Sequence, residues 1–273
     1  MSIKSQYSGF LNSSLLWENN SLFGLTQFDL PYSEVMVSDI TSISIPKNEV
    51  LGKRIEHFFE YLINTSGAYQ IILKNKQIFK NKITIGELDF LLEDIQQKQI
   101  IHIELVYKFY LYNPEKSDIE LERWIGPNRT DSLLEKITKL KTKQLPLLYR
   151  PESIVALNEI GVNIKNIKQQ ICFFGNLFIP IALKNKSFPK LNNHCIVGFW
   201  IALKDFTSEK YGSNVYYIPQ KKDWIAKPKH HRDWYTYDAI QEPLNIQLSK
   251  KRSPLLWIKS KGDFFSKCFV VWW

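Results

Sequence analysis

The chain has 273 residues, and its 44% hydrophobic and 23% charged residues exclude the polar composition of disordered chains. The formal net charge is +9 at pH 7, which favours anionic partners such as nucleic acid, because positive potential concentrates phosphates. Only six of the 36 basic residues are Arg, and Lys, Asn and Ile are all frequent, so A/T-rich coding is an alternative explanation of the charge.

Neither the cysteines nor the apolar runs indicate a secreted or membrane protein. Cys172, Cys195 and Cys268 are odd in number, far apart and without a CxxC pair, so they suggest neither a disulfide framework nor a zinc cluster. The first twenty residues contain no apolar signal segment, and no run reaches the ~18 apolar residues of a membrane span. We therefore expect a cytoplasmic protein without a membrane partner.

The chain divides by pattern into three parts. Residues 1–49 have no sustained period, so we expect an irregular N-terminal segment. Residues 50–185 carry the periodic elements of a core domain, and residues 186–273 form a β-rich C-terminal region with six of the eight tryptophans. We expect this aromatic region to pack on the core, because so many tryptophans need burial.

The core begins with a helix and three strands. Apolar residues from Leu51 to Leu62 recur at helical spacing, and Gly67 marks the end of that helix. The run 69–73 predicts a short strand, and Asn75 with its flanking lysines predicts a turn. The alternating stretches 83–92 and 100–112 predict two longer strands, the second with a polar face that carries the side chains of His102, Glu104, Val106 and Lys108.

A second helix and a further strand complete the core. Thr130 or Ser132 is the expected N-cap, with Ser132 and Glu135 at the spacing of a capping box, and the helix is expected to stop near Pro146. The apolar run 170–179 predicts the next strand. The predicted order is therefore helix, strand, strand, strand, helix, strand, which makes this an α/β (α+β) protein.

Two carboxylates are expected to oppose each other across the predicted hairpin. A four-residue turn at 95–98 places Asp89 opposite Glu104. Directly opposed residues have Cβ atoms ~4.5–5.5 Å apart on one face, so the two carboxylates can share one cation. Otherwise, a proton or a basic neighbour must compensate their repulsion.

The segment GELDFLL, followed by HIEL in the next strand, resembles the acid-bearing hairpin of the PD-(D/E)XK phosphodiesterase superfamily. The αβββαβ order is similar to the core of that superfamily. More closely, GELDFLL, HIELVYKFYLY, WIGPNRTDSLLEKITKLKTKQLPLLY and the terminal FVVWW resemble an uncharacterised bacterial family, domain of unknown function 1853. The resemblance runs over most of the chain.

The resemblance implies roles for individual residues. Asp89 and Glu104 match the two metal-binding acids, and Glu56 matches the helix acid that contacts metal through water. Val106 stands where the superfamily has its lysine, and Lys108 lies one pleat further along the same face. Lys108 assists catalysis only if its side chain folds back toward the metal.

Together these features predict a Mg²⁺- or Mn²⁺-dependent nuclease that hydrolyses phosphodiester bonds of DNA or RNA. The alternative, motivated by Val106, is a catalytically inactive protein of the same fold that serves as a nucleic-acid-binding or assembly module. The residues proposed to bind nucleic acid are Lys136, Lys139, Lys143 and Arg129.

Ordinary structural roles compete with these assignments. Glu87, Asp89 and Glu104 also fit a solvated strand face, and a lysine stripe on a helix usually serves only to solvate it. Trp224 and Trp234, together with the cluster 230–232, could stack bases, but an aromatic core explains them equally well.

Overall fold

The computed structural model describes residues 1–18, 22–31, 43–228, 233–260, 262 and 264–273. The chain forms two compact units, each assembled from stretches that lie far apart in the sequence. Unit 1 contains residues 1–14, 108–134 and 175–273, and unit 2 contains residues 15–107 and 135–174. The limits predicted at residues 49 and 185 stay a prediction.

Unit 2 begins with the predicted helix, α2 (Leu51–Ser66). Its apolar stripe is buried, with Phe58 and Phe59 fully enclosed. Phe59 packs against Phe90 of the following strands, with ring centroids 4.8 Å apart. The helix ends as predicted at Gly67, whose left-handed φ of 66° suits glycine.

Strands β1 (Tyr69–Lys80) and β2 (Ile83–Asp94) form an antiparallel hairpin. The turn consists of Asn81 and Lys82, both with positive φ, as a two-residue hairpin loop requires. The prediction of a turn at Asn75 is wrong, because Asn75 lies inside β1 with a φ of 51°. Asparagine tolerates this left-handed conformation, so it marks an irregular point within a strand as readily as a turn.

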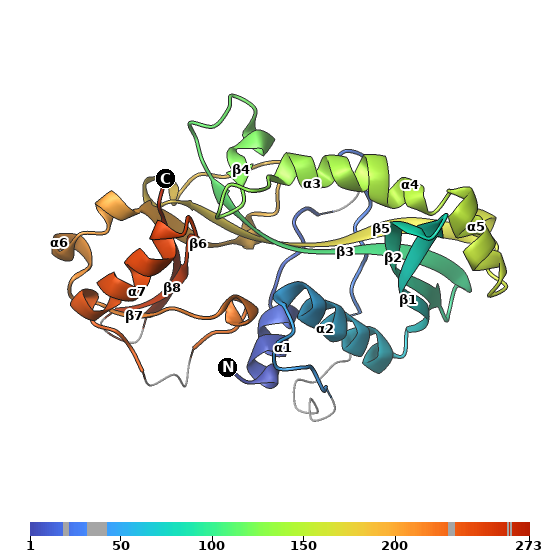
Figure 1. Ribbon diagram of the computed structural model, residues 1–273, viewed down its shortest axis with the longest axis horizontal. Helices are drawn as coiled ribbons and strands as arrows, with labels where there is room; N and C mark the ends of the chain where they lie inside the picture. The colour runs from blue at the N-terminus through green and yellow to red at the C-terminus, as the bar shows by residue number, and fades with distance from the viewer. Residues whose placement is uncertain (19–21, 32–42, 229–232, 261, 263) are drawn as a thin grey trace. The chain divides into compact units, whose positions relative to one another are not determined.

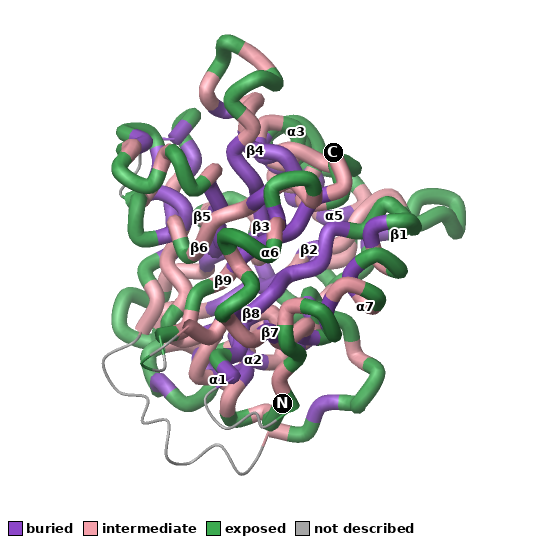
Figure 2. Tube along the Cα trace, turned by 90° about the vertical axis from the view of Figure 1, so that its left-hand side faces the viewer, coloured by how far each residue is buried: buried purple, intermediate pink, exposed green. Residues whose placement is uncertain are grey.

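Strand β3 (Gln99–Tyr112) pairs antiparallel with β2 from Asp94↔Gln99 to Phe90↔Ile103. The predicted register and the four-residue turn at 95–98 are confirmed. Buried stretches run along both strands (Figure 2). The buried face fixes this register, because a slip of one residue would turn every side chain to the opposite face.

The second predicted helix consists of three parts, and α5 (Pro151–Asn158) follows it. The parts are α3 (Leu133–Lys139), the wider π-helical turn η4 (Leu140–Gln144) and α4 (Leu145–Leu147). The helix thus begins directly after Ser132, one of the two predicted N-caps, and ends at Leu147, near Pro146 as predicted, with Pro146 inside its last turn. Proline lacks an N–H and clashes with the preceding turn, and a widened turn accommodates it.

Leucines of the helices α4 and α5 pack on the hairpin of unit 2. Leu147 and Leu157 join Leu88 and Leu91 of β2 in one buried cluster. Figure 1 shows α2 on one side of β1–β3 and α4 with α5 on the other. Helices on two sides leave β2 and β3 in the interior, where polar side chains need partners.

Unit 1 contains a helix that the sequence reading missed. Helix α1 (Ile3–Leu11) lies in the segment expected to be irregular, and the side chain of Ser2 caps it by accepting a hydrogen bond from Ser5 N. The other helices and short helical turns outside unit 2 are η3 (Glu120–Arg123), η6 (Ile181–Leu183), η7 (Asn193–Cys195), η8 (Leu203–Asp205), α6 (Ser208–Tyr211), η9 (Lys221–Asp223) and α7 (Tyr237–Ser249).

The remaining strands are β4 (Trp124–Ile125), β5 (Ile167–Pro180), β6 (Ile196–Ala202), β7 (Val215–Tyr217), β8 (Leu255–Ser260) and β9 (Phe264–Val271); the turn η5 (Ile164–Asn166) precedes β5. The nine strands form one mixed sheet in the order β1-β2-β3-β5-β6-β9-β8-β7, with β4 paired to β3. The protein is therefore a mixed α/β protein, and the helix–strand–strand–strand–helix–strand order predicted for residues 51–179 is present, with β4 and α5 as additions. Within the part of the chain that the structure describes, none of the helices combines the length and apolar character needed to cross a bilayer.

Candidate metal-binding site

Asp89 and Glu104 lie at the end of the β2–β3 ladder in unit 2. The last printed pair is Phe90↔Ile103, and continuing the register by one residue sets Asp89 opposite Glu104. Glu104 is fully buried and Asp89 is half-buried. The Oδ2 atom of Asp89 accepts a hydrogen bond from the backbone N of Leu105 at 2.9 Å, so its carboxylate is held against β3.

The pKa of Asp89 is raised from its ordinary value of 3.8 to about 8. Burial is the largest cause, and the carboxylate of Glu104 is the next. The charge of Glu56 also raises the pKa, whereas the Leu105 N–H and the ammonium of Lys136 lower it. Two carboxylates in such surroundings retain a proton unless a cation is bound between them.

A hydrogen-bonded chain connects Glu104 to helix α3. Its Oε2 atom accepts a hydrogen bond from Gln144 Nε2, and Gln144 Oε1 accepts one from Lys136 Nζ at 2.7 Å. Gln144 is the last residue of the π-helical turn η4. Sequence reasoning did not predict this contact of Gln144, because Gln144 and Glu104 are 40 positions apart in the chain.

The other oxygen of Glu104 faces His102. Glu104 Oε1 and His102 Nε2 are 3.3 Å apart, and both side chains are fully buried. The contact has ion-pair distance but lacks hydrogen-bond alignment, so Glu104 Oε1 has no hydrogen-bond donor among the described residues. A buried acceptor left in this way costs free energy unless another group binds it.

Gln169 of β5 fixes the orientation of His102. Its Nε2 atom lies 3.0 Å from His102 Nδ1 and donates to Leu145 O at 2.8 Å. With one amide hydrogen directed to each acceptor, His102 Nδ1 accepts and the ring proton resides on Nε2, toward Glu104. Neither Gln169 nor this function of His102 was predicted.

Glu56 reaches the same neighbourhood from α2, since its charge acts on Asp89. Its Oε2 atom accepts hydrogen bonds from Lys53 Nζ and Asn75 Nδ2, both at 2.8 Å. Lys53 Nζ also lies 3.5 Å from Glu87 Oε1. These carboxylates raise the pKa of Lys53 against the opposing effect of its burial.

Asn75 carries a second unpaired oxygen near the carboxylates. It lies on β1 between Lys74 and Lys76, which pair with the two neighbours of Asp89 on β2. Its Oδ1 atom is buried and has no hydrogen-bond partner among the described residues. An amide oxygen is a hard ligand of the kind that Mg²⁺ accepts. Asn75 is therefore a further candidate metal ligand at this site.

Lys108 belongs to unit 1 and has a carboxylate partner there. Its Nζ atom lies 2.7 Å from Asp131 Oδ2, and both side chains are partly exposed. Val106, at the position of the missing lysine, is buried in unit 2. The catalytic role predicted for Lys108 stays a prediction, and its ammonium now has a competing partner.

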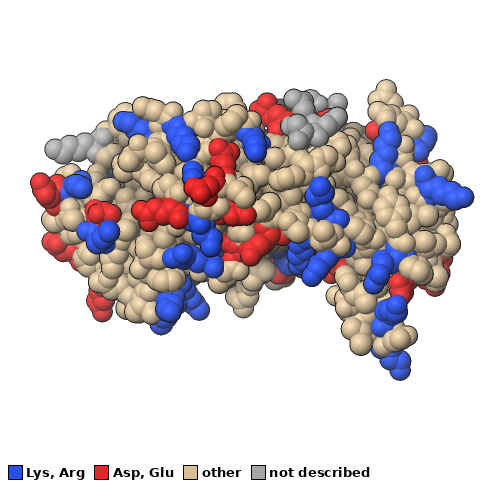
Figure 3. Space-filling view, turned by 90° about the horizontal axis from the view of Figure 1, so that it is seen from above, with Lys and Arg blue, Asp and Glu red and all other residues tan. Residues whose placement is uncertain are grey.

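The four predicted nucleic-acid-binding residues are divided between the units. Lys136 is half-buried at the carboxylates, whereas Lys139 and Lys143 are exposed in unit 2. Arg129, in unit 1, places its guanidinium 5.2 Å from the ring centre of Trp273. Figure 3 shows both Lys and Arg and Asp and Glu on one molecular face.

The potential metal ligands at this site favour a cation that binds few protein side chains. Among the described residues, no group of three or more His, Cys, Asp or Glu side chains is arranged to hold a metal ion. Two carboxylates therefore do not suit zinc, which takes three or four protein ligands. They do suit Mg²⁺, which keeps several waters and uses one or two carboxylates, and the unpaired Glu104 Oε1 is available for it.

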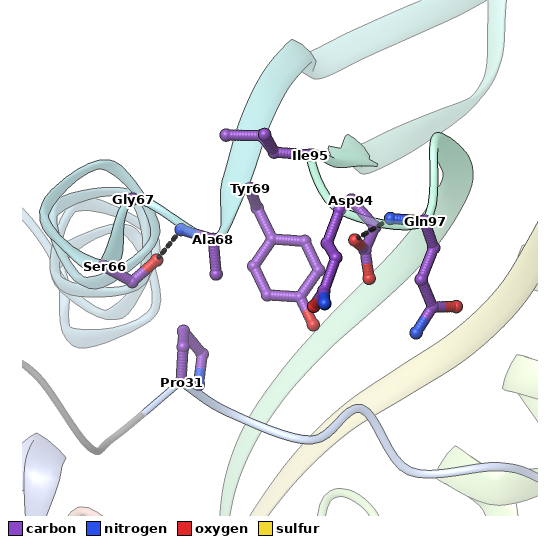
Figure 4. Close-up of a pocket in the computed structure, with 9 residues that line it drawn as sticks. Pro31, Ser66, Gly67, Ala68, Tyr69, Asp94, Ile95 and Gln97 are labelled. Atoms are coloured by element: carbon purple, nitrogen blue, oxygen red, sulfur yellow. Dashed lines mark hydrogen bonds between the residues drawn. The ribbon is translucent and has the colours of Figure 1, made fainter.

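A cavity of about 490 Å³ lies elsewhere in unit 2 (Figure 4). It is lined by the end of α2, by Tyr69 and by the β2–β3 turn from Asp94 to Gln97. Burial and the charges of Asp94 and Asp29 raise the pKa of Tyr69. Asp89 and Glu104 are not part of its lining, so it is distinct from the candidate site.

The structure thus defines a mixed α/β protein with a buried carboxylate pair on a central hairpin. The chain belongs to the family described as Domain of unknown function (DUF1853), whose model matches residues 25–267. Comparison with curated proteins and with solved structures gave no match.

Proposed function

We propose that this protein is a Mg²⁺- or Mn²⁺-dependent nuclease, or a hydrolase of related phosphodiesters, with Asp89 and Glu104 as metal ligands. The observation that carries the proposal is the opposed carboxylate pair, in which Asp89 has a pKa of about 8 and Glu104 Oε1 lacks a donor. Without a bound cation, the repulsion between the two carboxylates costs free energy. Groups with strongly shifted pKa values of this kind are concentrated at functional sites.

The element order also supports the proposal. The helix α2, the strands β1–β3, the helix α3 and the strand β5 follow one another as in a PD-(D/E)XK core. The two acids occupy β2 and β3, as the resemblance requires. The nuclease-like core expected for residues 50–185 is therefore part of the proposal.

Each residue has a separate task in this account. A bound Mg²⁺ would supply an activated water and neutralise charge on the phosphate. Gln144 orients Glu104 through Oε2, and Glu56, whose charge acts on Asp89, would support a metal-bound water. Lys136 takes the place of the lysine missing at Val106, because its ammonium already acts on Asp89.

One observation favours the alternative of an inactive nuclease-fold protein that binds nucleic acid or serves in assembly. Val106 is buried where the lysine is expected, and Lys108 is paired with Asp131. If Lys136 cannot reach a phosphate, the site would bind a cation without cleaving a substrate.

A cleavage screen on single- and double-stranded DNA and RNA with Mg²⁺ or Mn²⁺ tests the proposal. We expect activity in the wild type, its loss in Glu104→Gln, and its retention in Asp94→Asn. Asp94 is the control, because it is an acid of β2, the strand of Asp89, but accepts a hydrogen bond from Gln97 N in the turn. Activity that survives in Glu104→Gln would refute the assignment.

A further inference from the structure

The strands β7, β8 and β9 of unit 1 carry aromatic and lysine side chains in aligned rows. Tyr217 pairs with Trp257, and Trp257 pairs with Lys267. In the next row of the same face, Lys259 pairs with Phe265. Directly opposed residues point to the same side of a sheet, so these side chains form one face.

The opposite face of these strands is covered by α7. Tyr216, Ile258 and Cys268 alternate with the residues of the rows and are buried with Ile240 and Leu244 of the helix. The aromatic and lysine face is therefore not required for this hydrophobic core. Trp257 of the first row is itself buried, so the accessible rings of this face are those of Tyr217 and Phe265.

Trp234 joins the aromatic rings of this face. Its ring centroid lies 6.1 Å from that of Tyr217 and 5.7 Å from that of Phe265. All three side chains are half-buried, so each keeps part of its ring accessible. The residues 230–232, which the sequence grouped with Trp234, lie outside the described residues.

Three ammonium groups lie over these rings. Lys227 and Lys259 lie 5.3 and 5.9 Å from the ring centre of Phe265, and Lys267 lies 5.3 Å from that of Trp257. Burial lowers the pKa of Lys267 to about 8, and among the described residues no carboxylate forms an ion pair with it. An approaching anion would offset this loss of hydration.

A cavity of about 760 Å³ adjoins the rings. It extends from the rings to α7. Its lining consists of Tyr217, Ile218, Asp233, Trp234 and Tyr235, with Pro243 and Gln247 of α7. Its size is within the range of small-molecule sites, and its aromatic walls suit a flat ring. Asp233 and Gln247 supply hydrogen-bonding groups of the kind that recognise a base edge.

We propose that this face of β7, β8 and β9 binds single-stranded nucleic acid, with an unpaired base stacked at Trp234 and phosphates contacted by Lys227 and Lys259. Aromatic rings interleaved with lysines are the combination that holds single strands, because rings stack on bases and ammonium groups follow the backbone. A duplex hides its base faces and is bound less well. The proposal does not depend on metal chemistry at Asp89 and Glu104.

Fluorescence anisotropy of the full chain with short labelled oligothymidylate, oligouridylate and a blunt duplex, all in EDTA, tests the proposal. We expect binding to the single strands, which also shows whether DNA or RNA is preferred, and weaker binding to the duplex. Trp234→Ala should lower the affinity roughly 5- to 150-fold with an unchanged salt dependence, whereas Trp234→Phe should retain most of it.

Lys227→Gln and Lys259→Gln should each make the plot of log affinity against log salt shallower by ~0.7. Lys251→Gln is the matched control, because Lys251 lies over Trp272, at 5.7 Å, away from these rows, and should change nothing. Lys227 is exposed, so its variant stays informative if Trp234→Ala fails to fold.

Absence of binding at low salt, preference for the duplex, or equal affinity and slope in all variants would overturn the proposal. Because EDTA excludes cleavage, failure of the nuclease activity would not affect this result.

Discussion

His102 and Glu104 place Nε2 and Oε1 3.3 Å apart inside unit 2, with both side chains fully buried. Gln169 contacts the other ring nitrogen at 3.0 Å, which directs the ring proton toward Glu104. Gln144 binds the Oε2 atom of the buried acid, whereas Oε1 faces His102 without a hydrogen-bond donor among the described residues. The carboxylate is therefore positioned before any ligand arrives.

The first prediction concerns Gln169. Gln169→Met removes the donor to His102 Nδ1 and leaves this buried acceptor unpaired, whereas Leu145 O keeps the hydrogen bond from Leu148 N. We expect the free energy of unfolding to fall by ~1–3 kcal/mol, measured by urea denaturation. Gln70→Met, at an exposed position of β1, is the control and should stay within ~0.5 kcal/mol. If the two variants were equally stable, the contact between Gln169 and His102 would not contribute to the free energy of unfolding.

The second prediction is a pH dependence of stability caused by Asp89. Its pKa is about 8 in the folded protein, against an ordinary value of 3.8, so the folded state binds more protons between these values. Stability from this group is therefore complete at low pH and is lost as the pH rises toward 8. Asp89→Asn should remove this slope, which is at most ~1.4 kcal/mol per pH unit.

Thermal or urea unfolding from pH 4 to 8, without divalent cations, measures this difference, with Asp94→Asn as the reference. We expect Asp89→Asn to gain stability relative to the wild type as the pH increases, while Asp94→Asn follows the wild type. Parallel curves for the wild type and Asp89→Asn would contradict the raised pKa.

The third prediction decides between two lysines. If Lys136 stabilises the phosphate, Lys136→Met should lower turnover by ~10²–10³, as the loss of one positioned donor does. Lys108→Ala should leave turnover unchanged, because Lys108 Nζ is held by Asp131. Turnover numbers at saturating substrate give the comparison. Reduced turnover in Lys108→Ala with unchanged turnover in Lys136→Met would instead assign the catalytic role to Lys108, as expected from the sequence.

Local patterns in the sequence were sufficient for the hairpin and its acids. The alternation in β2 and β3, with a four-residue turn between them, fixes the register from Asp94↔Gln99 to Phe90↔Ile103, and one further residue of this register sets Asp89 opposite Glu104. The apolar stripe of α2 likewise follows from helical spacing alone. The hairpin register and the apolar stripe both depend only on residues that are close together in the sequence.

The partners of the carboxylates could not be predicted in this way. Asn75 occupies an irregular point of β1, and Gln144 reaches Glu104 because of the wide turn before Pro146. Gln169 comes from a strand distant in sequence. Such contacts depend on tertiary packing and backbone irregularities, which periodicity does not encode.

The central claim is that Asp89 and Glu104 bind a divalent cation, and isothermal calorimetry with Mg²⁺ and Mn²⁺ tests it most directly. At pH 7, binding should release a proton from Asp89, so the measured heat should vary with the ionisation enthalpy of the buffer. The account predicts one binding event that is lost in Asp89→Asn and retained in Asp94→Asn. Absence of binding in the wild type, or unchanged binding in Asp89→Asn, would contradict it.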